Sequence, residues 1–160
     1  MELTPPAVAR EREWIHDRTE TVVPLINETR DRLADCFGVE VGHVTPAAYR
    51  EEVTVVFADG ARAVNVAAYV ALLRDLDVID DYPGFVVDEV LGRELAATIA
   101  GGRPFSLLAQ ATFHFADVFT HTEGGAGADD LDAALAAGFQ TRLPGWEWTE
   151  RKSPFAVDRE

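Results

Sequence analysis

Aromatic and polar side chains alternate along residues 105–122, and this alternation constrains the fold more than any other feature of the chain. Apolar residues recur at odd positions of the segment, and polar residues fill most even positions. The apolar ones are Phe105, Leu107, Phe113, Phe115 and Phe119. Successive side chains of a β-strand point to opposite faces of its sheet. The spacing therefore predicts one long strand with an aromatic side that faces a core.

The length and composition predict a single globular domain over residues 1–160, with frayed ends at 1–5 and 150–160. Of the 160 residues, 48% are hydrophobic, which is enough to form one core. The glycine-rich stretch 123–128 is expected to be a flexible loop. Acidic residues number 28 against 14 basic ones, and the net charge of -14 disfavours nucleic acid and anionic membranes as partners.

Cysteine content and hydropathy predict a cytoplasmic protein. Cys36 is the only cysteine, so no disulfide can form within the chain, and a reducing compartment is the simpler interpretation. No segment approaches the roughly 20 apolar residues that cross a bilayer. Residues 1–18 are polar and charged, whereas a signal peptide has an apolar run there.

Helix-capping patterns predict helices in the first part of the chain. Thr4 followed by proline starts a helix that Gly38 ends, and Pro24 kinks or divides it. Thr45 followed by proline starts a second, short helix over residues 47–52.

Strands are predicted for most of the remaining chain. The dipeptide Asp59-Gly60 separates two β-branched, apolar runs, which is a strong hairpin signal because both turn positions need positive φ. Apolar residues at helical spacing then predict a third helix. Its range is 66–79, and further strands are expected over 85–91, 94–100 and 145–149, with a short helix over 129–138.

This order of elements resembles that of the SnoaL-like polyketide cyclases, ketosteroid isomerase and nuclear transport factor. The residues that carry the resemblance are Tyr49–Phe57, Gly60 and Val66–Arg74, which are similar to the family's second helix, first strands and third helix. The resemblance implies an α+β fold, in which a curved antiparallel sheet wraps around N-terminal helices as a cone, like a cystatin-type α+β barrel. It also implies a cavity for a small apolar molecule. Members of the family isomerise, cyclise, hydrate or dehydrate substrates without metal or organic cofactor, or only bind and form a homodimer.

Asp117 and His121 are the candidate catalytic residues, because they are the ionisable side chains on the aromatic face of the expected strand. Four steps along a strand separate them by about 13 Å, so each acts alone or with another strand. Phenylalanines on both sides of Asp117 are expected to raise its pKa and make it a general acid or base. Solvated side chains at the open end of the sheet are the alternative. The expected ligand-binding residues are Tyr69, Phe113, Phe115, Phe119 and Trp146.

A non-catalytic protein of the same fold is a second hypothesis. It uses the open face of its sheet to dimerise or to bind a protein partner. Trp146 and Trp148 are its expected anchors, because tryptophan is enriched among the residues that dominate binding energy.

A helical metal-binding protein is a third hypothesis. In a helix, His114, Asp117 and His121 share one face through steps of three and four residues, a spacing that can hold a divalent metal. Glu13 and His16 are three residues apart on the first helix and complete the site, as Glu-x-x-His pairs do in helical bundles. The preferred hypothesis expects no metal and no cofactor.

Overall fold

The computed structural model describes residues 1–76, 86–118 and 126–146, with only the backbone of 126–128. Seven helices account for most of these residues, and none of the residues described lies in a strand. The helices are α1 (Pro5–Asp17), α2 (Thr19–Phe37), α3 (Pro46–Ala58), α4 (Gly60–Asp75), α5 (Val87–Ala100), α6 (Phe105–Val118) and α7 (Ala126–Gln140). The predicted α+β cone with a curved antiparallel sheet is therefore wrong, and the fold is all-helical.

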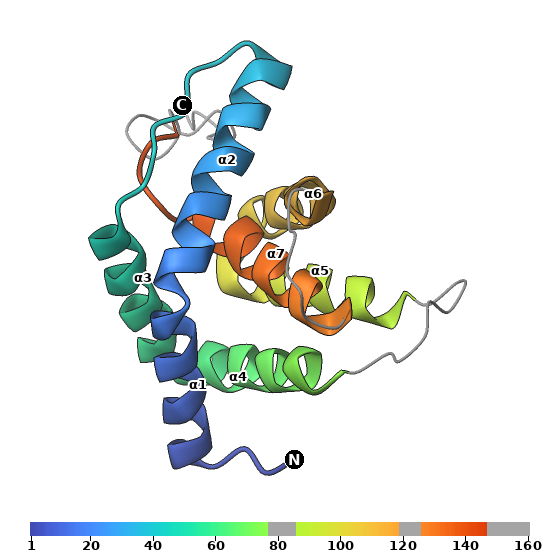
Figure 1. Ribbon diagram of the computed structural model, residues 1–160. Helices are drawn as coiled ribbons and strands as arrows, with labels where there is room; N and C mark the ends of the chain where they lie inside the picture. The colour runs from blue at the N-terminus through green and yellow to red at the C-terminus, as the bar shows by residue number, and fades with distance from the viewer. Residues whose placement is uncertain (77–85, 119–125, 147–160) are drawn as a thin grey trace, which may run out of the picture.

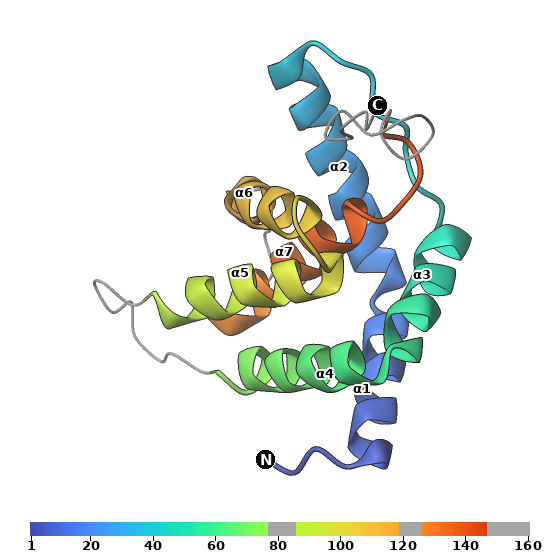
Figure 2. The same cartoon turned by 180° about the vertical axis from the view of Figure 1, so that it is seen from behind.

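Helices α1 and α2 follow one another along one side of the molecule, and α4, α5, α6 and α7 run across them (Figure 1). Arg18 separates α1 from α2, so the first predicted helix is divided before Pro24 and not at it. Helix α3 packs against α1, α2 and α4. Seen from behind, α4 and α5 lie side by side (Figure 2). Helices α5, α6 and α7 all pack against one another, and we call them the three-helix unit.

The capping residues predicted from the sequence are confirmed. Thr4 Oγ1 accepts a hydrogen bond from the backbone N–H of Ala7 (3.3 Å). Thr45 Oγ1 accepts one from the N–H of Ala48 (3.1 Å), and proline follows the cap in both helices. Gly38 ends α2 in the left-handed conformation (φ 63°), which glycine adopts without a steric penalty. The interactions that start and end these helices are local, so the sequence alone reveals them.

The predicted hairpin at Asp59-Gly60 is a corner between two helices. Asp59 caps α4 by accepting a hydrogen bond from the backbone N–H of Arg62 (3.3 Å), and Gly60 is the first residue of that helix. An aspartate can serve either purpose, because it favours turns and also satisfies an amide at a helix start. The apolar runs on both sides, predicted as strands, belong to α3 and α4. The third predicted helix, 66–79, exists, but α4 begins earlier and ends at Asp75.

The predicted strand over residues 105–122 is helix α6 as far as residue 118, and the rest of that segment lies outside the described residues. The buried positions of α6 are Ala109, Thr112, Phe113 and Ala116, which is a helical spacing. Leu107, expected on the core face, is 51% exposed. Alanine is a weak hydrophobic signal, so the alternating phenylalanines outweighed the alanines that face the core.

The other predicted strands are also not strands where the structure describes them. Residues 87–91 and 94–100 belong to α5, Val86 precedes that helix, and residue 85 lies outside the described residues. The described part of 145–149 is a turn. The helix predicted over 129–138 is confirmed as α7, which extends beyond that range at both ends.

Within the described residues, no single helix is long and apolar enough to cross a bilayer. The pair α3 and α4 reaches the necessary length and composition only when both helices are taken together, and they bend by 112° at their junction.

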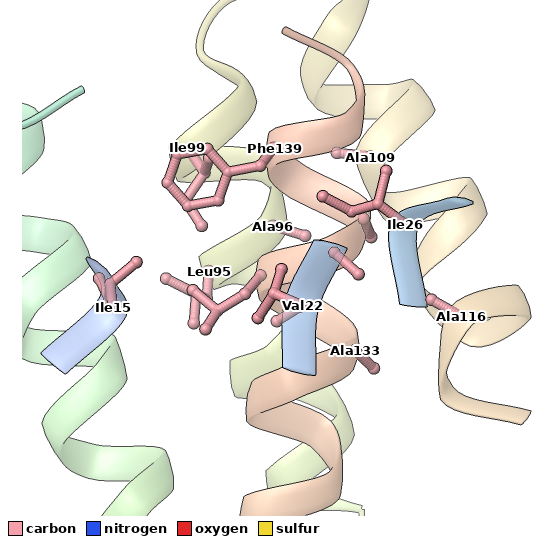
Figure 3. Packing of buried hydrophobic residues seen from close by; sticks show 14 of the residues in the cluster. Ile15, Val22, Ile26, Leu95, Ala96, Ile99, Ala109, Ala116, Ala133 and Phe139 are labelled. Carbon is pink, nitrogen blue, oxygen red and sulfur yellow. The ribbon is translucent and has the colours of Figure 1, made fainter. Parts of the chain in front are cut away.

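Helix α7 is enclosed by its neighbours. It packs against α2, α4, α5 and α6, and every residue from 130 to 141 is buried. In Figure 3, side chains of α2, α5 and α6 gather around Ala133 and Phe139 of α7. Much of α7 is alanine or glycine, so its neighbours approach the backbone closely: a Cβ at Gly138 would lie 2.8 Å from Ile99 Cβ. A helix surrounded in this way has to be apolar or small on every face.

Arg30 of α2 holds the C-terminal end of α7. Its side chain is fully buried and donates only to backbone carbonyl groups. The acceptors are Gly42 O and Pro144 O for Nη1 (2.6 Å each), and Gln140 O (2.7 Å) and Leu143 O (2.9 Å) for Nη2. The last carbonyl groups of a helix have no partner within it and carry partial negative charge. A cation at this end donates hydrogen bonds to such groups and is attracted by their charge. Burial lowers the pKa of Arg30 to about 10, which leaves it charged at neutral pH.

We expect Gly138→Ala to destabilise the protein by about 1–3 kcal/mol, the usual cost of extra volume in a packed core. The added methyl group would lie 2.8 Å from Ile99 Cβ and 3.0 Å from Ala96 O, and the backbone oxygen has little freedom to move. Denaturant titration measures the free energy of unfolding. Gly60→Ala is the matched control, because Gly60 also lies in a helix and its added methyl group meets nothing within 4 Å. A Gly138→Ala variant as stable as the control would contradict the close packing around α7.

Arg30→Met is expected to lower the free energy of unfolding by at least about 3 kcal/mol, because several buried carbonyl oxygens lose their donor at once. Arg10→Met changes an exposed arginine of α1 and should stay within about 0.5 kcal/mol of the wild type. Urea titration of both variants decides the matter. Similar losses in the two variants would show that Arg30 does not anchor the end of α7.

Candidate functional site

Helix α7 buries two aspartates, Asp130 and Asp132, and a buried carboxylate needs a compensating partner. Asp132 has one, since Arg18 binds it through Nε to Oδ1 (3.2 Å) and Nη2 to Oδ2 (2.6 Å). The guanidinium groups of Arg18 and Arg74 both lie over the ring of Trp14, at 5.6 and 5.2 Å from its centre. Asp132 is thus held by an ordinary ion pair that joins α7 to the end of α1.

Asp130 contacts two other carboxyl groups and is bonded to no basic side chain among the described residues. Its side chain forms hydrogen bonds with Asp88, in the first turn of α5, and with Asp117, in the last turn of α6. Helices α5 and α6 are joined by a short connection and pack against each other, which brings the start of α5 to the end of α6. We call Asp88, Asp117 and Asp130 the carboxylate cluster.

Burial and mutual repulsion raise the pKa of both Asp117 and Asp130. Desolvation is the largest cause in each case, because it disfavours the charged form. For Asp130, the hydrogen bond to Asp88 and the charges of Asp117 and Asp88 act in the same direction and raise the pKa to about 9. For Asp117, the hydrogen bond to Asp130 and the charge of His114 oppose part of the rise in pKa. Asp130 therefore holds a proton at neutral pH and can donate it in a hydrogen bond within the cluster.

A buried aromatic ring, that of Phe113, packs beside the carboxylate cluster. Phe113 is fully buried, one helical turn before Asp117, and its ring lies against Gly92, one turn after Asp88. A Cβ at Gly92 would lie 2.5 Å from Phe113 Cζ and 3.5 Å from Asp130 O. The ring keeps water away from one side of the cluster, which accounts for the desolvation of its carboxyl groups.

The outer side of the carboxylate cluster is partly open and apolar. Asp117 is only half-buried, whereas Asp88 and Asp130 are 9% and 6% exposed. Valines next to these aspartates in α5 and α6 are 43 to 54% exposed. They are Val86, Val87, Val90 and Val118. Exposed valines beside a reachable carboxyl group provide the mixture of apolar surface and a few polar groups that small ligands bind.

Asp117 is the predicted catalytic residue that the structure brings into the carboxylate cluster. His121 and Phe119 lie outside the described residues, so the predictions for them stay predictions. Asp88 and Asp130 were not predicted. A signal for Asp88 exists, because two antiparallel helices joined at Gly101 and Gly102 place it level with Asp117. Asp130 has no comparable signal, since only the packing of α7 brings it there.

The other predicted ligand-binding residues do not gather around one site. Phe113 belongs to the main core, and Tyr69 is half-buried against the same core. Phe115 and Trp146 belong to a second, smaller apolar cluster. Of these side chains, only Phe113 lies next to the carboxylate cluster.

Trp146, expected as an exposed anchor for a partner, is buried. Its indole lies under the guanidinium of Arg30 (5.6 Å), and its Nε1 donates to Gln140 Oε1 (2.8 Å). Trp146 therefore helps to close the end of α7. Trp148, the other expected anchor, lies outside the described residues.

Of the residues predicted for a helical metal site, the pair on α1 is not brought to the pair on α6, and His121 lies outside the described residues. Glu13 and His16 lie on α1, whereas His114 and Asp117 lie on α6, and the two helices are far apart in both views (Figures 1 and 2). Glu13 is paired with Arg12 (3.1 Å). In the part of the chain that the structure describes, no group of three or more histidine, cysteine, aspartate or glutamate side chains is arranged to hold a metal ion.

Comparison with known proteins assigns the chain to a family. The sequence model of that family matches residues 1–159. The chain belongs to DUF7984, a domain of unknown function. Searches of curated proteins and of solved structures find no match. Membership of DUF7984 assigns no chemistry, and it speaks neither for nor against the SnoaL-like resemblance, which stays a prediction although the fold expected from it is wrong.

Asp130→Asn is expected to make stability less dependent on pH. Burial raises the pKa of Asp130 to about 9, far above the value of about 3.9 for an unfolded chain. Between these values the native state holds a proton that the unfolded state has released, so the free energy of unfolding falls as pH rises. The fall is at most about 1.4 kcal/mol per pH unit, and it is complete above the folded pKa. Asparagine has no such proton, so the free energy of unfolding of the variant should rise relative to that of the wild type as pH increases.

Urea titrations at about pH 5, 7 and 9 measure this difference in stability. Asp17→Asn is the matched control, because Asp17 is exposed on α1 and the same change there should leave the pH dependence as it is. If the difference between Asp130→Asn and the wild type stays constant with pH, Asp130 does not hold a proton in the native state.

Proposed function

We propose that the carboxylate cluster is an acid–base site that acts on a small ligand with an apolar body. Asp117 exchanges a proton with the ligand, and Asp130 holds the proton that the two residues share. The observation that carries this proposal is the hydrogen-bonded contact of carboxyl groups from α5, α6 and α7, one of which is only half-buried.

The raised pKa of Asp117 supports this role. An ordinary aspartate ionises near pH 4, which makes it a weak base at neutral pH. Desolvation moves the pKa of Asp117 towards the pH at which it has to gain and lose a proton. When two carboxyl groups lie in contact, one holds the proton and the other the charge, so the pair of Asp117 and Asp130 supplies both an acid and a base.

The contrast between the two buried aspartates of α7 also supports a function at the cluster. Asp132 has an arginine as its partner, which stabilises its charge. Asp130 has carboxyl groups as partners, and these repel it whenever all of them are ionised. Like-charged groups held in contact lower the stability of the fold. They are typical of functional sites, where a shifted pKa lets a side chain act as an acid or a base.

The ligand class follows from the surroundings of Asp117. The exposed valines at the start of α5 and the end of α6 favour an apolar body, and the net charge of -14 repels nucleic acids and other polyanions. Proton transfer between a carboxyl group and a small molecule needs neither a metal nor an organic cofactor. We also place the protein in the cytoplasm, which its single cysteine, Cys36, supports.

A test uses 5-nitrobenzisoxazole, a small apolar carbon acid, as the probe. When a base removes its ring proton, the N–O bond breaks and a coloured cyanophenolate forms, so absorbance measures the rate of proton transfer. The wild type should accelerate this reaction, and Asp117→Asn should lose about a hundredfold of the acceleration, since an amide is not a base.

Asp17→Asn serves as the control for the change of an aspartate to asparagine and should react like the wild type. The unfolding midpoint of each variant shows that any loss of rate is not a loss of fold. Equal rates for the wild type and Asp117→Asn, or no acceleration by the wild type, would refute the proposed acid–base site.

A further inference from the structure

We propose that the proton shared by Asp88, Asp117 and Asp130 is a latch that holds together one end of α5, α6 and α7, and that alkaline solution opens this end. The latch needs no ligand, so it stands independently of the acid–base function proposed above. It is a property of the packing of the three-helix unit.

The position of the carboxylate cluster in the three-helix unit carries the proposal. Asp88 is the second residue of α5, Asp117 the last but one of α6, and Asp130 the fifth of α7. One aspartate thus comes from an end of each helix. With the proton present, Asp130 donates a hydrogen bond within the cluster. Without it, the carboxylates have no donor among themselves and repel one another at contact distance.

The charges that face the carboxylate cluster do not compensate for that loss. On α6, the charge of His114 opposes the rise in the pKa of Asp117, but this side chain is exposed, so solvent screens its charge. On α7, Asp129 adds further negative charge. Helices α2 and α4 also pack against α7, but the groups that shift the pKa of Asp130 are Asp88 and Asp117, on α5 and α6. Among the residues that the structure describes, deprotonation therefore adds repulsion between the carboxylates of the cluster.

The opposite end of the three-helix unit is closed by hydrogen bonds that do not depend on a proton shared between carboxyl groups. Arg30 bonds to the carbonyl groups of Gln140 and Leu143, and Trp146 Nε1 bonds to Gln140 Oε1. Opening should therefore be confined to the end that carries the carboxylate cluster.

Amide hydrogen exchange of the full chain tests the latch. Protection factors, which are normalised to the intrinsic exchange rate, are compared at about pH 7 and pH 9. Release of one proton on opening lowers protection by up to about tenfold per pH unit. This loss is expected in residues 91–93 and 114–117, whereas 97–100 and 137–140 at the other end should keep their protection.

Asp130→Asn should abolish the loss at 91–93 and 114–117, because an amide donates hydrogen bonds at every pH. Asp88→Asn is the second variant in case the first does not fold, and it should weaken the loss by removing one repelling charge. Asp17→Asn should behave like the wild type. Unchanged protection in the wild type, equal losses at both ends, or a wild-type loss in Asp130→Asn would each overturn the proposal.

Discussion

The burial of α7 on all sides is the constraint on which the rest of the structure depends. Four helices pack against it, which is possible because alanine and glycine leave room for them along most of its length. Enclosure has a second consequence. Every polar group that α7 carries has to find its partner inside the protein, because water cannot reach it.

The protein meets that requirement in three ways along one helix. At the C-terminal end, Arg30 binds the carbonyl group of Gln140, the last residue of α7, and that of Leu143 in the turn that follows. In the middle, Arg18 binds Asp132. At the N-terminal end, Asp130 shares a proton with Asp88 and Asp117. The first two solutions use the guanidinium group of an arginine, whereas the third depends on a proton. Burial raises the pKa of Asp132 as well, but only the third solution brings carboxyl groups into contact with one another, and one of them, Asp117, is half-exposed.

Some residues of the candidate site could be found from the sequence, and others could not. Asp117 was found because it interrupts a run of aromatic residues, and aromatic neighbours desolvate a carboxyl group whether the backbone is a strand or a helix. Asp88 would have followed from reading the segments around Gly101 and Gly102 as two antiparallel helices. Asp130 depends on how α7 is rotated against α5 and α6, and that rotation is set by contacts between segments far apart in the chain.

The sequence by itself determined the net charge, the lack of any intrachain disulfide, and the helix ends at Thr4, Gly38 and Thr45, because each depends on composition or on a few neighbouring residues. Tertiary structure decided whether the stretch from Phe105 onward became strand or helix. The alanines of α6 contribute to stability only when α7 packs against them. The spacing of its residues alone therefore did not distinguish a strand from a helix. Tertiary structure also decided whether the carboxylate cluster forms, since its three aspartates come from three helices. Only the packing of these helices brings the carboxyl groups into contact and removes water from them.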